Sequence, residues 1–227
     1  MRYAVLSDIH GNLEALEAVL RRLESEGIES YISLGDIVGY GADPSECIRL
    51  VRSLNPLFSI AGNHDWGVAG TFDLGGLSAD ARTAALWTRE KLERPEMEYL
   101  KSLPVTYGDK NFTLVHGSLV KPEEFDYILT KSDAIASMRL MTGPLLFVGH
   151  SHAPAVYSLE GGSKRIVNTG SVGQPRDRDP RASFVIYDDD TADIRTIRVD
   201  YDIEKARKKI IDAGLPAFLG NRLREGV

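Results

Sequence analysis

Imidazole and carboxylate groups recur in five short polar segments of the chain, and all five of its histidines lie in these segments. The segments are Asp8-Ile9-His10, Gly35-Asp36, Gly62-Asn63-His64-Asp65, His116-Gly117 and Gly149-His150-Ser151-His152. Nitrogen and oxygen ligands without sulfur are typical of manganese, zinc or iron sites. A lone histidine in a loop is usually only exposed or hydrogen-bonded. Here no histidine is left outside the segments, so the pattern favours a metal centre.

Each polar segment follows a short apolar run that is typical of a β-strand. The runs cover residues 3–6, 31–34, 57–60, 112–115 and 145–148. Two ligands one residue apart in an extended strand face opposite ways, so the chain has to bend after the strand to aim both inward. The adjoining glycines, at positions 11, 35, 62, 117 and 149, permit such bends and a close approach of the backbone.

The first 65 residues repeat one unit of strand, polar loop and usually helix, which predicts a parallel sheet whose strand ends converge on a site. Helices are expected at 13–23, with Asn12 placed as the cap, and at 44–54, with Asp43 placed as the cap. Helical patterns also cover 78–92, 95–103 and 203–213. The glycine-rich stretch 67–77 has weak periodicity and is interpreted as a loop or lid.

The second half of the chain predicts further strands at 155–159, 165–167, 184–187 and 194–199. Gly161-Gly162 and Asp188-Asp189-Asp190 mark tight turns between neighbouring strands, which indicates an antiparallel section. We therefore predict an α/β fold in which two packed mixed β-sheets are flanked by helices, a four-layer αββα sandwich. Residues 1–227 are expected to form a single domain, with a cap-like helical and loop segment around 66–103.

The composition narrows the class of protein. With 227 residues, 43% of them hydrophobic, the chain can bury a proper core. The net charge of -6 and the lack of a long basic run argue against a surface for extended nucleic acid. The single cysteine, Cys47, allows no internal disulfide and is expected in the core. No apolar run is long enough for a signal peptide or a membrane span, so we expect a cytoplasmic protein that binds no membrane. Nothing in the sequence predicts an oligomeric state.

The five polar segments, in this order and each behind a strand, resemble the motifs of the calcineurin-like metallophosphoesterases. The resemblance covers residues 8–152, continues more weakly through 168–173, and is strongest to the compact bacterial and archaeal members. It implies a dinuclear centre in which Asp36 bridges both ions and His64 stands free beside the substrate. The first ion would be held by Asp8, His10, Asp36 and His152. The second ion would be held by Asp36, Asn63, His116 and His150.

The resemblance also implies an activity, the hydrolysis of small phosphomonoesters or phosphodiesters by a metal-bound hydroxide, with His64 as the general acid. Two divalent or trivalent ions, of manganese, zinc or iron, are the expected cofactors. An amide rather than a carboxylate at Asn63 leaves the site net positive for an anionic substrate. Two alternatives stay open: a nuclease of the same superfamily, and a non-catalytic protein-binding scaffold like the retromer subunit of this fold.

Two further side chains are candidates for substrate binding. Asn12 either reaches the phosphate or only caps the first helix. Arg176, Arg178 and Arg181 alternate with aspartates, a pattern that more often belongs to a solvated, self-paired loop. Arg176 is the substrate-binding candidate of the three because it follows a glycine-containing loop most closely.

Three polar residues are expected to support the site without binding metal. Asp65 is interpreted as a residue that orients His64 or caps the next segment. Asn168 and Ser171 are expected to steady the ligand loops from behind.

Overall fold

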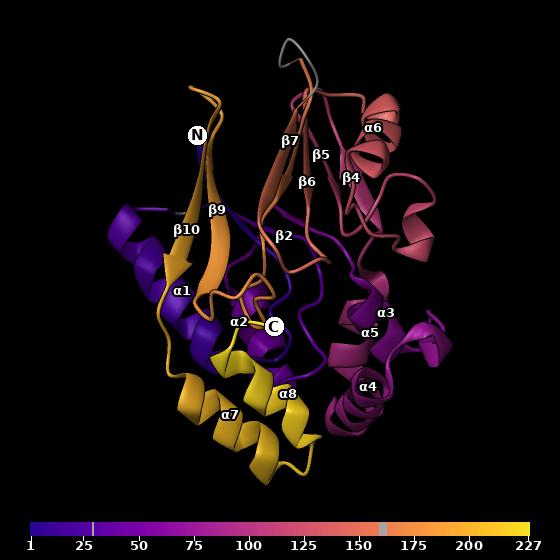
Figure 1. The fold of residues 1–227 in the computed structure, drawn as a ribbon, viewed down its shortest axis with the longest axis vertical. Helices are drawn as coiled ribbons and strands as arrows, with labels where there is room; N and C mark the ends of the chain where they lie inside the picture. The colour runs from indigo at the N-terminus through magenta and orange to yellow at the C-terminus, as the bar shows by residue number, and fades with distance from the viewer. Residues whose placement is uncertain (29, 159–162) are drawn as a thin grey trace.

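Ten β-strands form two five-stranded sheets in the computed structural model, which describes residues 1–28, 30–158 and 163–227 (Figure 1). Both sheets mix parallel and antiparallel neighbours. The first sheet has the order β10-β9-β1-β2-β3 and contains β1 (Arg2–Leu6), β2 (Ser30–Ser33), β3 (Phe58–Ser59), β9 (Ala182–Asp188) and β10 (Asp193–Val199). The second sheet has the order β4-β5-β6-β8-β7 and contains β4 (Thr106–Gly108), β5 (Phe112–Val115), β6 (Leu145–Val148), β7 (Ala155–Ser158) and β8 (Arg165–Asn168).

The alternation of side chains along the strands places the two sheets face to face. In β1, Val5 packs into the core between the sheets, whereas Leu6 packs on the other side, under the outer helices. In β6, Phe147 packs between the sheets, whereas Val148 packs under α6 (Lys131–Leu140). These central strands are therefore buried on both faces, and the predicted four-layer αββα sandwich is confirmed.

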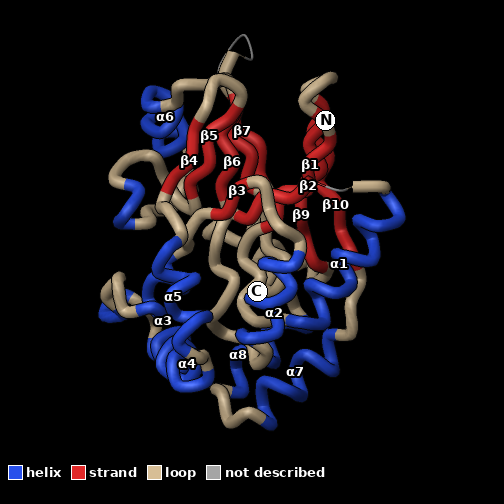
Figure 2. The backbone as a smooth tube through the Cα atoms, turned by 180° about the vertical axis from the view of Figure 1, so that it is seen from behind, coloured by secondary structure: helices blue, strands red, loops and turns tan. Residues whose placement is uncertain are grey.

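Eight α-helices lie in the described parts of the chain. Besides α6 they are α1 (Leu13–Glu26), α2 (Pro44–Ser53), α3 (Asn63–Ala69), α4 (Ala79–Lys91), α5 (Arg94–Ser102), α7 (Ile203–Asp212) and α8 (Ala217–Asn221). Helices α1 and α2 pack against the outer face of the first sheet. Helices α3, α4, α5, α7 and α8 gather at one end of the molecule, and α6 lies at the other (Figure 2). None of the helices within the described ranges is both long and apolar enough to cross a bilayer.

Partly buried ion pairs fasten α7 to the first half of the chain. The Lys209 ammonium lies 2.7 Å from Glu14 Oε1 and 2.9 Å from Asp43 Oδ2, and Glu14 is only 5% exposed. Asp43 is the N-cap residue of α2, as predicted, but its carboxylate binds Lys209 and accepts no capping hydrogen bond. A contact with a residue far along the chain has replaced the local one.

The stretch 67–77 is not the continuous loop that its glycines predicted. Helix α3 occupies its first part, and a short 3-10 helix follows at Leu74–Gly76. The helix begins because the Asp65 carboxylate accepts the backbone N–H of Gly62, and it ends at Gly70, whose φ of 82° is left-handed. The start of this helix, which the weak periodicity of the sequence did not predict, thus depends on the buried Asp65 carboxylate.

The other helices that the sequence predicted are confirmed to within about three residues, and Cys47 is buried in the core as expected. The turn at 188–190 joins β9 to β10, also as expected. The sequence does not predict β4, α6 and α8; α6, for example, buries only three residues, which is too few for a clear apolar stripe. The expected turn at Gly161-Gly162 and the end of the strand at Leu159 lie outside the described residues.

Candidate metal centre

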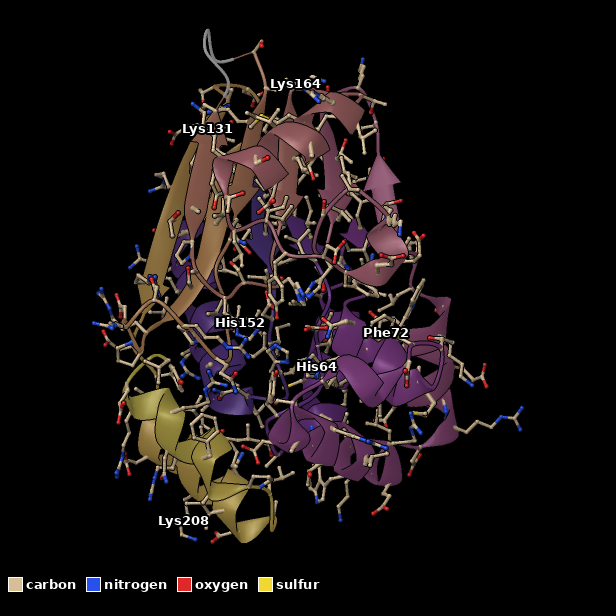
Figure 3. All side chains as sticks on the ribbon, turned by 45° about the vertical axis from the view of Figure 1, so that its right-hand side comes forward. His64, Phe72, Lys131, His152, Lys164 and Lys208 are labelled. Atoms are coloured by element: carbon tan, nitrogen blue, oxygen red, sulfur yellow. The ribbon has the colours of Figure 1, made fainter. Side chains whose placement is uncertain are left out.

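All seven predicted metal ligands converge at the carboxyl ends of parallel strands. One of them, His152, is labelled near the centre of the molecule in Figure 3. The segments follow β1, β2 and β3 in the first sheet and β5 and β6 in the second. Parallel strands end at one edge of a sheet, so loops that are far apart in sequence meet there. Each of the ligands is at most 8% exposed. The site is therefore assembled by the sandwich itself.

The predicted first ion has a matching set of ligand atoms. His10 Nε2 lies 3.6 Å from Asp8 Oδ1 and 3.5 Å from Asp36 Oδ2. His152 Nε2 lies 3.3 Å from Asp8 Oδ1 and 3.1 Å from His10 Nε2. Ligand atoms about 2.1 Å from one ion lie roughly 3–3.5 Å from each other, so these spacings suit a single ion.

The predicted second ion has its own set, which shares one atom with the first. His116 Nε2 lies 3.3 Å from Asp36 Oδ2, and His150 offers a nitrogen within 4.8 Å of both residues' ligand atoms. Asn63 lines the same cavity beside Asp36 and His150. Asp36 Oδ2 therefore stands between His10 on one side and His116 on the other, as a bridging ligand would.

Backbone carbonyls fix which ring nitrogen each histidine presents. The Nδ1 atoms of His10, His116 and His152 lie 3.0, 2.8 and 2.6 Å from the carbonyl oxygens of Val38, Leu34 and Gln174, respectively. A carbonyl oxygen can only accept, so each Nδ1 carries the proton and each Nε2 keeps its lone pair for a metal when the ring is neutral.

Each of the two aspartates Asp8 and Asp36 uses one carboxylate oxygen for a backbone hydrogen bond and leaves the other one available to a metal. Asp8 Oδ2 accepts the backbone N–H of His150 at 3.0 Å, and Asp36 Oδ1 accepts that of His64 at 2.8 Å. Within the described residues, the other oxygen of each carboxylate is buried without a hydrogen-bond partner, as are Asn63 Oδ1 and His116 Nε2. Unpaired buried polar atoms are costly. Four of them in one site fit a pair of bound cations.

Five of the seven ligands sit in left-handed backbone conformation, a state that costs a non-glycine residue about 1–3 kcal/mol. They are Asp8, His10, Asp36, His150 and His152, with φ between 52° and 65°. The left-handed positions supply the bends that were predicted after the strands. They let residues one apart, which an extended strand would point to opposite faces, both face the metals.

Close backbone approach accounts for two of the glycines in the motifs. A Cβ at Gly62 would lie 2.0 Å from Asp36 Oδ1, and one at Gly149 would lie 1.9 Å from Ser7 Oγ and 2.5 Å from Asp8 Oδ2. The backbone at Gly62 lies directly against the Asp36 carboxylate, and the backbone at Gly149 lies directly against that of Asp8. Any side chain there would displace a ligand.

Three buried polar residues hold the ligand loops from behind. Asp65 accepts the backbone N–H groups of Asp36, Ile37 and Val38 at 2.7–3.3 Å, in addition to capping α3. The capping interpretation of Asp65 is confirmed, and its carboxylate binds backbone amides rather than His64. The supporting roles of the other two are confirmed as well: Asn168 donates to the carbonyl of Gly149, and Ser171 donates to that of Asp8.

Of the two substrate-binding candidates, Asn12 and Arg176, only Arg176 lines the cavity over the metal ligands. Asn12 caps α1 through Oδ1 and donates Nδ2 to the carbonyl of Gly173, so the structure favours the capping role. Of the neighbours of Arg176, Arg181 is paired with Asp179 on the surface, as a self-paired loop would be.

The cavity above the ligands has a volume of about 210 Å³ and contains side chains that the sequence did not single out. Tyr40 and Tyr127 contribute rings to its wall, and Tyr127 stacks on His150 at 3.9 Å between ring centroids. Arg222, from the 3-10 helix Arg222–Arg224, reaches it from the far end of the chain. Of these residues, only Tyr40 could have been noticed in the sequence, because it lies between two glycines in the loop after Asp36.

Comparison with known proteins agrees with this geometry. The sequence profile described as the calcineurin-like phosphoesterase superfamily domain matches residues 1–192. The chain belongs to the calcineurin-like phosphoesterase superfamily. It is 42% identical to an uncharacterised protein of Methanocaldococcus jannaschii, with 97% of this chain and 96% of that protein covered. It is 25% identical to the phosphodiesterase YfcE of Escherichia coli, over 86% of this chain and 91% of that enzyme.

A solved structure gives the same assignment. The metallophosphoesterase from Sphaerobacter thermophilus superposes with a TM-score of 0.90 and 39% sequence identity, and the match covers 100% of this chain and 99% of that one. This calcineurin-like protein is therefore a phosphoesterase, and its buried aspartate and histidine clusters fit the dinuclear metal centre of the family.

The aspartates and histidines of this phosphoesterase shift one another's pKa values. Burial tends to raise the pKa of Asp36, but His116 and His64 outweigh it and hold that pKa well below its usual range. Burial lowers the pKa of His116, but Asp36 and Asp8 outweigh it and raise the pKa to about 9. Without metal, His116 thus holds a proton, and that proton must leave before Nε2 can bind an ion.

Manganese or zinc should therefore stabilise the protein. At a hundredfold excess over the dissociation constant, we expect a gain of about 2.7 kcal/mol, which for a chain of this size is roughly 5–11 °C in Tm. The His116 proton stabilises the metal-free fold below its ordinary pKa of 6.5, and that contribution is lost as the pH rises towards about 9. The stabilisation by metal should accordingly grow with pH across this window.

Thermal melts with each ion and with chelator, at about pH 6 and about pH 8, measure this. Calcium at equal ionic strength is the control, because it prefers all-oxygen sites. A Tm indifferent to manganese, zinc and chelator would contradict the metal centre.

Proposed function

We propose that the chain hydrolyses small phosphoesters at two metal ions bridged by Asp36, with His64 as the general acid. The observation that carries this proposal is the position of Asp36 Oδ2, which is 3.5 Å from His10 Nε2 and 3.3 Å from His116 Nε2 and has no hydrogen-bond partner among the described residues. A carboxylate oxygen shared by two imidazoles suits a pair of ions. If bound there, a pair of ions would supply a water of lowered pKa and positive charge for the phosphoryl oxygens.

The protein's own residues would orient the phosphate group. Asn63 would bind the second ion without adding negative charge, which keeps the site attractive to anions. Arg176 would bind a phosphate oxygen, since its Nε is buried and has no hydrogen-bond partner in the described structure. Manganese, zinc and iron all suit the imidazole and carboxylate donors, so the metal available to the protein would determine which ion binds.

His64 is placed to act on the leaving group. It lines the cavity, and its backbone N–H is fixed by Asp36 at 2.8 Å. Burial lowers the pKa of His64 to about 3, so the imidazole is neutral at physiological pH in the free protein. An arriving phosphate anion favours the protonated form, which would supply the acid when the substrate is bound.

The segment 66–103 would contribute to specificity. Leu77 and Ser78 line the cavity over the ligands, and Ala81 lies beside them at the start of α4. The direct test of the activity is hydrolysis of bis-p-nitrophenyl phosphate by the manganese-loaded protein. Absence of hydrolysis with both metal sites filled would defeat the enzymatic proposal and favour a protein-binding scaffold.

The nuclease alternative leads to a separate prediction. The net charge of -6 and a cavity of about 210 Å³ favour a small substrate over a long polyanion. We expect long duplex DNA to have a lower kcat/KM than bis-p-nitrophenyl phosphate at physiological salt. A short dinucleotide is the control for phosphodiester chemistry itself, and processive digestion of duplex DNA would establish the nuclease instead.

A further inference from the structure

One wall of the metal-centre cavity carries two guanidinium groups, those of Arg176 and Arg222. Arg176 follows the second sheet's ligand loops, and its backbone N–H donates to the carbonyl of His152 at 3.1 Å. Arg222 comes from the C-terminal 3-10 helix, beyond residue 192, where the match to the family profile ends. The family motifs therefore give no role to Arg222.

Packing holds Arg222 at this wall. Leu219 and Leu223, on either side of it in the chain, are buried in one apolar cluster with Tyr40. The guanidinium lies 5.1 Å from the ring centroid of Phe218, and Nε donates to the main-chain oxygen of Val227. Its two terminal nitrogens have no hydrogen-bond partner within the described residues.

Arg176 is held in a comparable way. Its guanidinium lies 5.5 Å from the centroid of the Tyr40 ring, and one terminal nitrogen donates to Gln174 Oε1 at 2.7 Å. Its Nε is buried and, in the described ranges, unpartnered. Both arginines are thus pre-positioned by aromatic rings and still have donors to offer.

No aspartate or glutamate of the described ranges pairs with either charge. Among the described residues, the hydrogen-bond acceptors of the two guanidinium groups are Gln174 Oε1 at Arg176 and the main-chain oxygen of Val227 at Arg222. Burial, and then the charge of Arg176, lower the pKa of Arg222, while Tyr40 and Asp80 oppose them. Two like charges at a partly buried wall repel each other, and a bound anion would remove that repulsion.

The pair is offset from the metals. The backbone N–H of Arg176 donates to the carbonyl of the ligand His152, and the Tyr40 ring lies against both the Arg176 guanidinium and the His10 ring. Arg222 lines the same cavity, and its guanidinium contacts Phe218 and Val227, neither of which is a predicted ligand. An anion held by both arginines would therefore lie in the same cavity as the scissile phosphate.

We propose that Arg176 and Arg222 form a second anion subsite, which binds a phosphate group carried by the substrate away from the bond that is cut. The planar donor forks of two arginines suit a phosphate better than a single point charge would. This inference rests on the proposed function and names its substrate class: small phosphoesters that bear an additional phosphate.

A matched pair of chromogenic esters tests the subsite. Thymidine 5′-(p-nitrophenyl phosphate) and its 3′-phosphorylated form differ only in the additional phosphate. We expect the wild type to prefer the 3′-phosphorylated ester in kcat/KM. Arg222→Gln should reduce that preference by roughly tenfold or more, mainly through KM, because charged hydrogen bonds are lost. Arg222→Lys should recover part of it.

Arg224→Gln is the matched control. Arg224 belongs to the same 3-10 helix but pairs with Glu204 on the surface and does not line the cavity. This variant should leave the preference as in the wild type. A wild type without preference, or an Arg222→Gln variant that loses equally on both esters, would overturn the subsite.

Failure of the function itself is recognisable separately. If neither ester is hydrolysed by manganese-loaded protein, the proposed function fails. Calorimetric binding of thymidine 3′,5′-bisphosphate against thymidine 5′-monophosphate then still tests the subsite. Tighter binding of the bisphosphate that is lost in Arg222→Gln supports it, and equal binding of both nucleotides overturns it.

Discussion

Asp36→Asn is expected to weaken both metal sites together and to abolish measurable turnover. Asp36 Oδ2 faces His10 Nε2 and His116 Nε2 at once and lies nearer to both than Asp8 Oδ1 does, so a neutral amide would remove a charged oxygen that both clusters share. The loss in rate should exceed the ~10²–10³-fold that one missing electrostatic contact typically costs. Metal analysis and kinetics on the same samples measure both effects.

Asp43→Asn is the control for removing a carboxylate near the site. Asp43 lies in the neighbouring loop and pairs with Lys209, not with a metal-facing histidine. This variant should keep two ions per chain. Fully active wild type with a single ion per chain would show that Asp36 is no bridge.

His64→Ala should keep both ions and lose turnover by about 10²–10⁴-fold on alkyl phosphoesters, the usual contribution of a general acid. His64 is held by its backbone N–H to Asp36, and that contact survives the substitution. The loss should be smaller on p-nitrophenyl esters, because that leaving group departs readily as an anion. Kinetics on both ester types, with metal content measured alongside, separate the proton donor from the ligands.

His64→Gln sharpens the interpretation, since glutamine can donate a hydrogen bond but cannot supply the proton. If it restores activity on alkyl esters, or if His64→Ala loses equally on both ester types with the metals intact, His64 positions the phosphate and is not the acid.

The predicted ligands could be located from the sequence because each lies next to a strand end. A strand is recognisable from a few apolar residues, and the following bend needs only local backbone conformations, here left-handed at Asp8 and His10. The same holds for the choice of Arg176, which rested on its closeness to a loop of the site. Sequence patterns over a few residues were therefore enough to locate side chains whose position depends on the nearest strand and the bend after it.

Elements decided by distant contacts could not be predicted. Asp43 looks like a helix cap, but Lys209, 166 residues away, takes its carboxylate. Arg222 carries no local sign of function and reaches the cavity only because its neighbours pack against Tyr40. Helix α3 depends on Asp65, whose carboxylate also gathers amides from the loop after β2. In each case the deciding partner lies in another part of the chain.

The ion pairs of Lys209 mean that the family profile stops short of the unit that folds. The profile match ends at residue 192, yet Glu14 in α1 pairs with Lys205 and Lys209, which both lie after it. A chain shortened at residue 192 would keep every metal ligand, but it would lose β10, which pairs with β9, and the helix that covers Glu14. The segment after residue 192 is therefore structural support for the metal centre, although it carries none of the predicted ligands.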